Sequence, residues 1–110
     1  MNDEIKCYLK KYPQEIVNLY MELREIIYSV NAANIEEKMW AKLPSYYDEE
    51  KYIRLIPFKD HINIETTGLA DYMEAFAGYK FTPKGMLQIS SKQNIPRDIL
   101  MNAFKNTFLN

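Results

Sequence analysis

The stretch Arg54-Leu-Ile-Pro-Phe-Lys-Asp-His-Ile-Asn-Ile-Glu65 decides the fold, because it predicts two β-strands that pair as a hairpin. With Lys59 and Asp60 as a two-residue turn, the strands 52–58 and 61–66 place Arg54 opposite Glu65. Alternation gathers the apolar side chains on one face: Ile53, Leu55, Pro57, Ile62 and Ile64. One register explains both the apolar face and the charge pair, so we expect a half-buried antiparallel hairpin.

The flanking sequence extends this hairpin into a meander. We expect a first strand over 35–42, which ends near Leu43-Pro44 because proline cannot donate to a central ladder. A short strand over 45–48 follows, with the acidic run 48–51 as a solvated turn, and residues 86–90 alternate as a further strand. The pattern predicts a largely antiparallel sheet of about five strands.

Helical periodicity frames these strands. Asp3 is a candidate N-cap for a short helix, and Pro13 suits the first position of a second helix that reaches Val30. A short amphipathic helix follows Gly68, with Leu69, Tyr72, Met73 and Phe76 on its apolar face, and Pro96 opens a last helix. We therefore expect a single α+β domain over 1–110, with an N-terminal helix pair, a middle helix and a C-terminal helix packed on the sheet.

Composition limits the classes of function. The chain has 110 residues, with 14 basic and 15 acidic side chains and a net charge of -1, which predicts no nucleic-acid or membrane partner. Cys7 is the only cysteine, which excludes an intrachain disulfide and a multi-cysteine zinc site. No basic leader and no apolar run of ~20 residues is present, so we expect a cytoplasmic protein. Phosphate loops, nucleophile elbows and zinc-protease motifs are also absent, so we expect binding rather than catalysis.

Several short motifs follow one another along the chain: Trp40, then Leu43-Pro44-Ser45-Tyr46, the 54–65 hairpin, Gly78-Tyr79, Pro83–Gln88, and Ile95-Pro96. In this order and spacing the chain resembles the YdhG-like domain family (DUF1801 type), a family of largely unassigned function. The resemblance implies a compact two-layer α+β fold. It also implies one candidate activity, because one branch of the family is regarded as a frataxin-like iron chaperone.

Two acidic runs are the candidate metal ligands under that interpretation. They comprise Glu36, Glu37, Asp48, Glu49 and Glu50. Exposed carboxylates suit weak, exchangeable binding of iron and its delivery to an iron-accepting protein. The alternative is a solvated turn with no metal role. No cofactor is firmly indicated, and iron is a possible one.

A second set of residues predicts a ligand-binding surface. It combines aromatic and polar side chains from the meander: Trp40, Lys42, Tyr46, Tyr47, Arg54, His61, Asn63 and Lys84. Aromatic walls with a few fixed donors suit a small anionic or aromatic ligand. The alternatives are a wet face with ion pairs such as Arg54–Glu65, a lone His61 that packs on Phe58, and an aromatic homodimer interface. Both a monomer and a homodimer fit the sequence.

Overall fold

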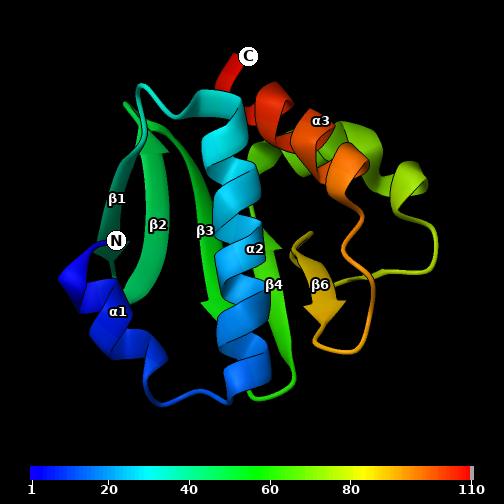
Figure 1. Ribbon diagram of the computed structural model, residues 1–110. Coiled ribbons are helices and arrows are strands. Elements are labelled where there is room, and N and C mark those ends of the chain that lie inside the picture. Colours follow the sequence, from blue (N-terminus) through cyan, green and yellow to red (C-terminus); the bar gives the residue numbers. More distant parts are fainter. Residues whose placement is uncertain (110) are drawn as a thin grey trace.

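Six strands form one antiparallel sheet in the order β1-β2-β3-β4-β6-β5 (Figure 1). A computed structural model describes residues 1–109. The strands are β1 (Glu36–Trp40), β2 (Leu43–Asp48), β3 (Lys51–Pro57), β4 (His61–Glu65), β5 (Lys80–Phe81) and β6 (Leu87–Ser90). The sheet has one strand more than the predicted five. The additional strand is β5, which has only two residues.

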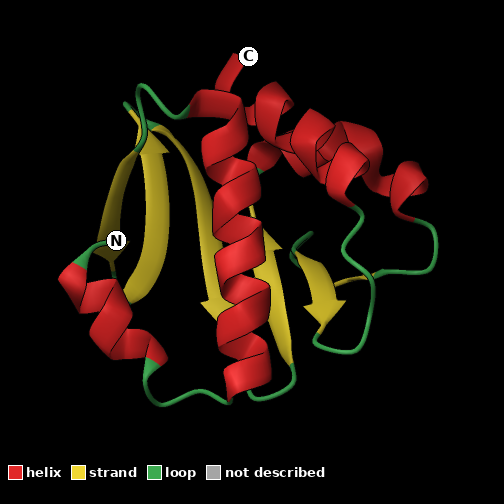
Figure 2. Ribbon diagram, in the orientation of Figure 1, coloured by secondary structure: helices red, strands yellow, loops and turns green. Residues whose placement is uncertain are grey.

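Helices cover one face of this sheet, which makes the domain a two-layer α+β fold as predicted (Figure 2). They are α1 (Asp3–Leu9), α2 (Gln14–Asn31), the 3-10 helix η1 (Thr67–Phe76) and α3 (Arg97–Leu109). The long α2 runs across the middle of the sheet and buries Tyr20, Leu23 and Ile27 against it. No helix within residues 1–109 is long and apolar enough to cross a membrane.

The central hairpin has the predicted register. Arg54 pairs with Glu65 and Leu55 pairs with Ile64, and the Phe58 N–H donates to the His61 carbonyl at 2.8 Å across the turn. All five residues of the predicted apolar face are buried under the helices. This face of β3 and β4 is therefore the floor of the core.

The first hairpin turns earlier than expected. Ala41 and Lys42 form its two-residue turn with positive φ angles of 49° and 67°, so β1 ends at Trp40. Pro44 lies inside β2 opposite Met39, whereas β2 begins to pair with β3 only at Ser45. Proline is tolerated because this end of β2 carries one neighbour instead of two.

The helix ends also differ in detail from the expectation. Asn2, not Asp3, caps α1, since its side-chain oxygen accepts from the Ile5 N–H at 3.1 Å. Pro13 takes the N-cap position of α2, and α3 begins directly after Pro96. The segment after Gly68 is a 3-10 helix, and Met73 on its expected apolar face is exposed.

Candidate ligand-binding face

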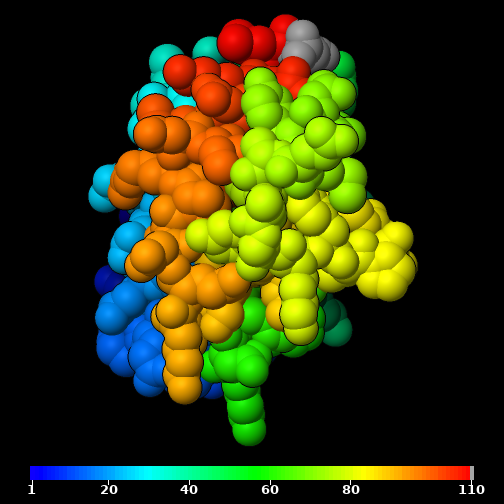
Figure 3. Space-filling model, turned by 90° about the vertical axis from the view of Figure 1, so that its right-hand side faces the viewer, coloured from blue at the N-terminus to red at the C-terminus, as the bar shows by residue number. Residues whose placement is uncertain are grey.

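The sheet face opposite the three α-helices carries most of the predicted ligand-binding residues. Strand alternation places Trp40, Tyr47, Arg54 and Asn63 there, because their sequence neighbours Met39, Tyr46, Leu55 and Ile64 face the helices. The segment 80–86, which includes Lys84, projects beyond the sheet on the side away from α2 (yellow in Figure 3). We call this surface the uncovered face.

Arg54 is the centre of the uncovered face. Its guanidinium donates from Nε to Ser45 Oγ at 2.9 Å, from Nη1 to Glu65 Oε1 at 3.0 Å and from Nη2 to the Tyr47 hydroxyl at 2.8 Å. The residue is only 4% exposed, although no helix covers it. Ser45, Arg54 and Glu65 lie in one cross-strand row, so the register itself aligns acceptor, donor and counter-ion.

Aromatic rings shield this arginine from solvent. Its Cζ lies 4.3 Å from the centroid of the Trp40 ring and 4.1 Å from that of Tyr52. Tyr52 also lies beside Tyr47, with ring centroids 5.4 Å apart. Trp40 is nevertheless 51% exposed, so one side of its ring is open to a ligand. We call Trp40, Tyr47, Tyr52 and Arg54 the aromatic cluster.

Two hollows adjoin β6. The first, of about 300 Å³, is lined by Tyr52, Glu65, Thr66, Thr67, Ala70, Met73, Lys84, Gly85 and Met86. We call it the Tyr52–Lys84 hollow, and it abuts the aromatic cluster through Tyr52. The second, of about 290 Å³, is lined by Asp60, His61, Gly78, Lys80, Gln88, Ser90 and Gln93. Each volume is near the lower limit for a site that holds one small molecule.

His61 packs on Phe58 as predicted and also lines the second hollow. Its ring stacks on Phe58 with centroids 4.5 Å apart, and its Nδ1 lies 2.7 Å from Asp60 Oδ1. The hydrogen bond to His61 lowers the pKa of the Asp60 carboxyl. Two positions along β4 from His61, Asn63 Oδ1 is buried and has no hydrogen-bond partner within residues 1–109. An acceptor of this kind is where a ligand donor would be stabilised.

Two of the predicted ligand-binding residues lie elsewhere, which corrects their assignment. Tyr46 belongs to the core on the helical side, with its hydroxyl 2.6 Å from that of Tyr20, and burial raises the pKa of both phenols. It neighbours Tyr47 in a strand, so the two side chains must point to opposite faces. Lys42 occupies the first turn and lines a different hollow, between α1 and Met39.

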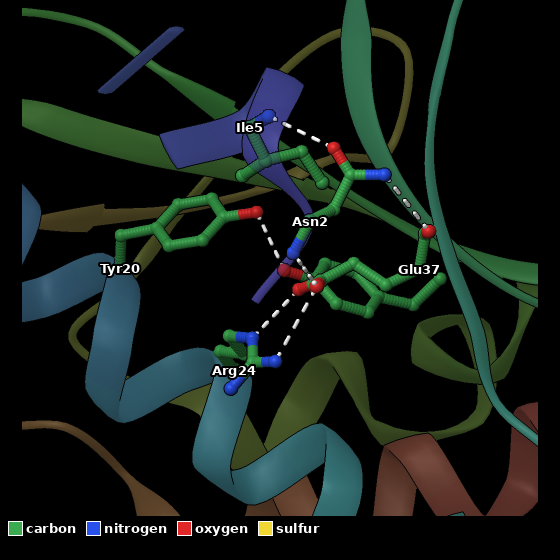
Figure 4. A network of polar contacts seen from close by, with 6 residues as sticks. Asn2, Ile5, Tyr20, Arg24 and Glu37 are labelled. Carbon is green, nitrogen blue, oxygen red and sulfur yellow. Dashed lines mark hydrogen bonds and ion pairs between the residues drawn. The ribbon is translucent and has the colours of Figure 1, made fainter. Parts of the chain in front are cut away.

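The candidate metal ligand Glu37 is part of the helix–sheet interface (Figure 4). Its carboxylate accepts from Arg24 Nε at 2.6 Å and from the Asn2 backbone N–H at 2.7 Å. Burial alone would raise its pKa, but the hydrogen bonds from Arg24, Asn2 and Tyr46 lower the pKa below its ordinary value. Glu37 therefore ties α1 and α2 to β1 and is not an exchangeable surface ligand.

The other acidic residues predicted as metal ligands do not lie together with Glu37. Strand alternation places the Glu36 side chain on the uncovered face, where its Oε1 lies 3.4 Å from Lys38 Nζ. Asp48 Oδ2 accepts a hydrogen bond from Asn31 Nδ2 at 2.9 Å. Glu49 and Glu50 form an exposed two-residue turn. In the described part of the chain, no three His, Cys, Asp or Glu side chains lie close enough together to hold a metal ion.

Ser45 and Met73 were not among the residues predicted for a site. Ser45 could have been found by extending the hairpin register into the preceding strand, since it lies opposite Arg54. Met73 reaches the Tyr52–Lys84 hollow only through the tertiary placement of η1, for which local sequence carries no signal.

Comparison with known proteins supports the fold. No family model matches the chain, and no curated protein matches it. Among solved structures, a DUF1801 family protein, YdhG from Bacillus subtilis, superimposes with a TM-score of 0.83 at 17% sequence identity. The match covers 97% of this chain and 90% of the other. The likeness gives no support to the frataxin-like branch of the expectation. What it shows is that this chain has the YdhG-like α+β fold.

Proposed function

We propose that this protein is a non-catalytic binding module whose small ligand lies on the uncovered face against the aromatic cluster. The observation that carries the proposal is the packing of Arg54, which three hydrogen bonds and two rings hold in place on an open sheet face. Aromatic side chains fixed in this way lose little conformational entropy when a ligand stacks on them.

Four ionisable groups of this face are held in pairs. Arg54 pairs with Glu65 at 3.0 Å, and His61 contacts Asp60 at 2.7 Å. Each of these groups is held by its neighbour, so the four side chains present fixed positions for recognition of a ligand. The unpartnered Asn63 Oδ1 supplies an acceptor in the same sheet layer.

A fragment screen followed by amide NMR tests this function. We expect binders to shift the amides of the aromatic cluster and to change the fluorescence of Trp40, the only tryptophan. The variant Trp40→Ala should weaken these binders, because it removes the stacking surface. The matched control is Met21→Ala, which removes an exposed apolar side chain from α2 on the other layer.

The same NMR spectra would also show results that contradict this proposed function. Binders that shift only helix amides, or that tolerate Trp40→Ala as well as Met21→Ala, would show that the uncovered face is not the binding site. Concentration-dependent broadening of the cluster amides without any fragment would identify the face as a homodimer contact instead.

A further inference from the structure

The charges of the uncovered face do not cancel. Two of its acids have a cationic neighbour, because Glu36 lies 3.4 Å from Lys38 and Glu65 pairs with Arg54. The third acid, Asp60, contacts His61, which counts as neutral in the net charge of the chain. Lys80 and Lys84 have no acidic partner within 4.0 Å among residues 1–109. The face then has four cations, Lys38, Arg54, Lys80 and Lys84, and three carboxylates, so it carries net positive charge although the whole chain has a net charge of -1.

Of these two lysines, Lys84 lies beside apolar surface. It lines the Tyr52–Lys84 hollow together with Tyr52, Met73 and Met86. Met73 is 46% exposed, so it offers open apolar surface at the rim. Lys80 instead lines the other hollow, among polar groups such as Gln88 and Ser90.

Glu65 does not neutralise Lys84. Its Oε1 accepts from Arg54 Nη1 at 3.0 Å, so its charge is already matched by the buried guanidinium. The one uncompensated charge of the Tyr52–Lys84 hollow is thus the Lys84 ammonium, at the edge of a mainly apolar cavity of about 300 Å³. A cavity of this kind is complementary to a small molecule with an apolar body and one anionic group.

We propose that the Tyr52–Lys84 hollow binds a small amphipathic anion, with its carboxylate or similar group on Lys84 and its apolar body between Tyr52 and Met73. This inference rests on the proposed function and specifies the ligand class and the residue that selects it. A lysine ammonium is suited to this role as a compact point charge with three donors.

Amide NMR titrations with phenylacetate, phenethyl alcohol, phenethylamine and acetate separate charge from apolar body. We expect phenylacetate to bind about tenfold more tightly than phenethyl alcohol, as one charge-assisted hydrogen bond would provide. Phenethylamine and acetate should bind more weakly still, because one has the wrong charge and the other has no ring.

Three lysine variants test the residue. Lys84→Met should raise the Kd of phenylacetate about tenfold and leave that of phenethyl alcohol unchanged, whereas Lys84→Arg should retain most of the affinity. Lys80→Met is the matched control, since it removes the other unpaired cation of the face without altering the hollow. Equal phenylacetate affinity in Lys84→Met and the parent protein would overturn the proposal.

The outcomes also distinguish this inference from the proposed function. Phenylacetate shifts confined to the hollow around His61 and Lys80, with sensitivity to Lys80→Met, would overturn this site but leave the uncovered face as the binding surface. Equal affinity for acetate and phenylacetate would likewise overturn the Tyr52–Lys84 site and leave the uncovered face as the binding surface. Absence of any shift on that face, both with these probes and in the fragment screen, would overturn both.

Discussion

Glu37 on β1 accepts hydrogen bonds from Arg24 on α2 through both of its carboxylate oxygens, at 2.6 and 3.3 Å. The Glu37 side chain is 7% exposed and the Arg24 side chain 23% exposed, so the pair is largely withdrawn from water. It joins the longest helix to an edge strand, and α1 reaches the same carboxylate through Asn2.

Removal of this charge should destabilise the fold. We expect Glu37→Gln to lower the free energy of unfolding by about 2 kcal/mol, because it leaves a partly buried guanidinium without its counter-ion. Urea denaturation followed by circular dichroism measures the effect. Glu36→Gln is the control. Glu36 precedes Glu37 in β1 and lies on the opposite, solvated face, so its substitution should change the free energy of unfolding by less than about 0.5 kcal/mol.

The same pair should make stability sensitive to acid. The folded pKa of Glu37 lies below its ordinary value of 4.5, so its contribution is complete above that value and is lost as the pH falls through the lower folded pKa. We expect the stability gap between the parent protein and Glu37→Gln to be widest near neutral pH and to narrow below the ordinary value. A gap that stays constant into strong acid would show that the charge contributes nothing.

Gly68 should be intolerant of any side chain. A Cβ at this position would lie 2.1 Å from the Ala103 carbonyl oxygen and 2.3 Å from Thr107 Oγ1, which also accepts from the Gly68 N–H at 3.0 Å. We expect Gly68→Ala to separate η1 from α3 and to cost about 3 kcal/mol or more in thermal or urea unfolding.

A second glycine separates steric from conformational cost. Gly85 has a φ of +85° but open space around its ideal Cβ position. Gly85→Ala should therefore cost only about 1–2 kcal/mol, the penalty of a left-handed alanine. Similar losses in both variants would contradict the close approach of η1 and α3.

A glycine in the turn between β1 and β2 should stabilise the protein. Lys42 has a φ of 67°, a conformation that costs an L-residue free energy and that glycine adopts freely. We expect Lys42→Gly to raise the unfolding free energy by about 0.5 kcal/mol after the entropy of the unfolded chain is counted. Lys38→Gly in the adjoining strand should do the reverse, and a loss in both variants would argue against the left-handed turn.

The hairpin of β3 and β4 was predictable because two independent signals agree on one register, namely apolar alternation and the Arg54–Glu65 pair. Tyr46 was misassigned because the strand was expected to begin at Ser45 and offers little apolar alternation to show which tyrosine faces inward. β5 has two residues, too few for any period. The contact between Gly68 and α3 joins segments about 39 positions apart, so no local pattern announces it.

The two sides of the Tyr52–Lys84 hollow are joined to the sheet in unequal ways. Tyr52 and Glu65 belong to strands that pair with their neighbours through short turns. The segment with Lys84 depends on a strand that returns to β4 from beyond η1 and on the two residues of β5. Hydrogen exchange should thus be fast around Lys84 and slow around Arg54, since regions with few stabilising contacts open locally without global unfolding. If so, local opening around Lys84 would set how quickly a ligand enters and leaves, while the side with Arg54 would set how tightly it is held.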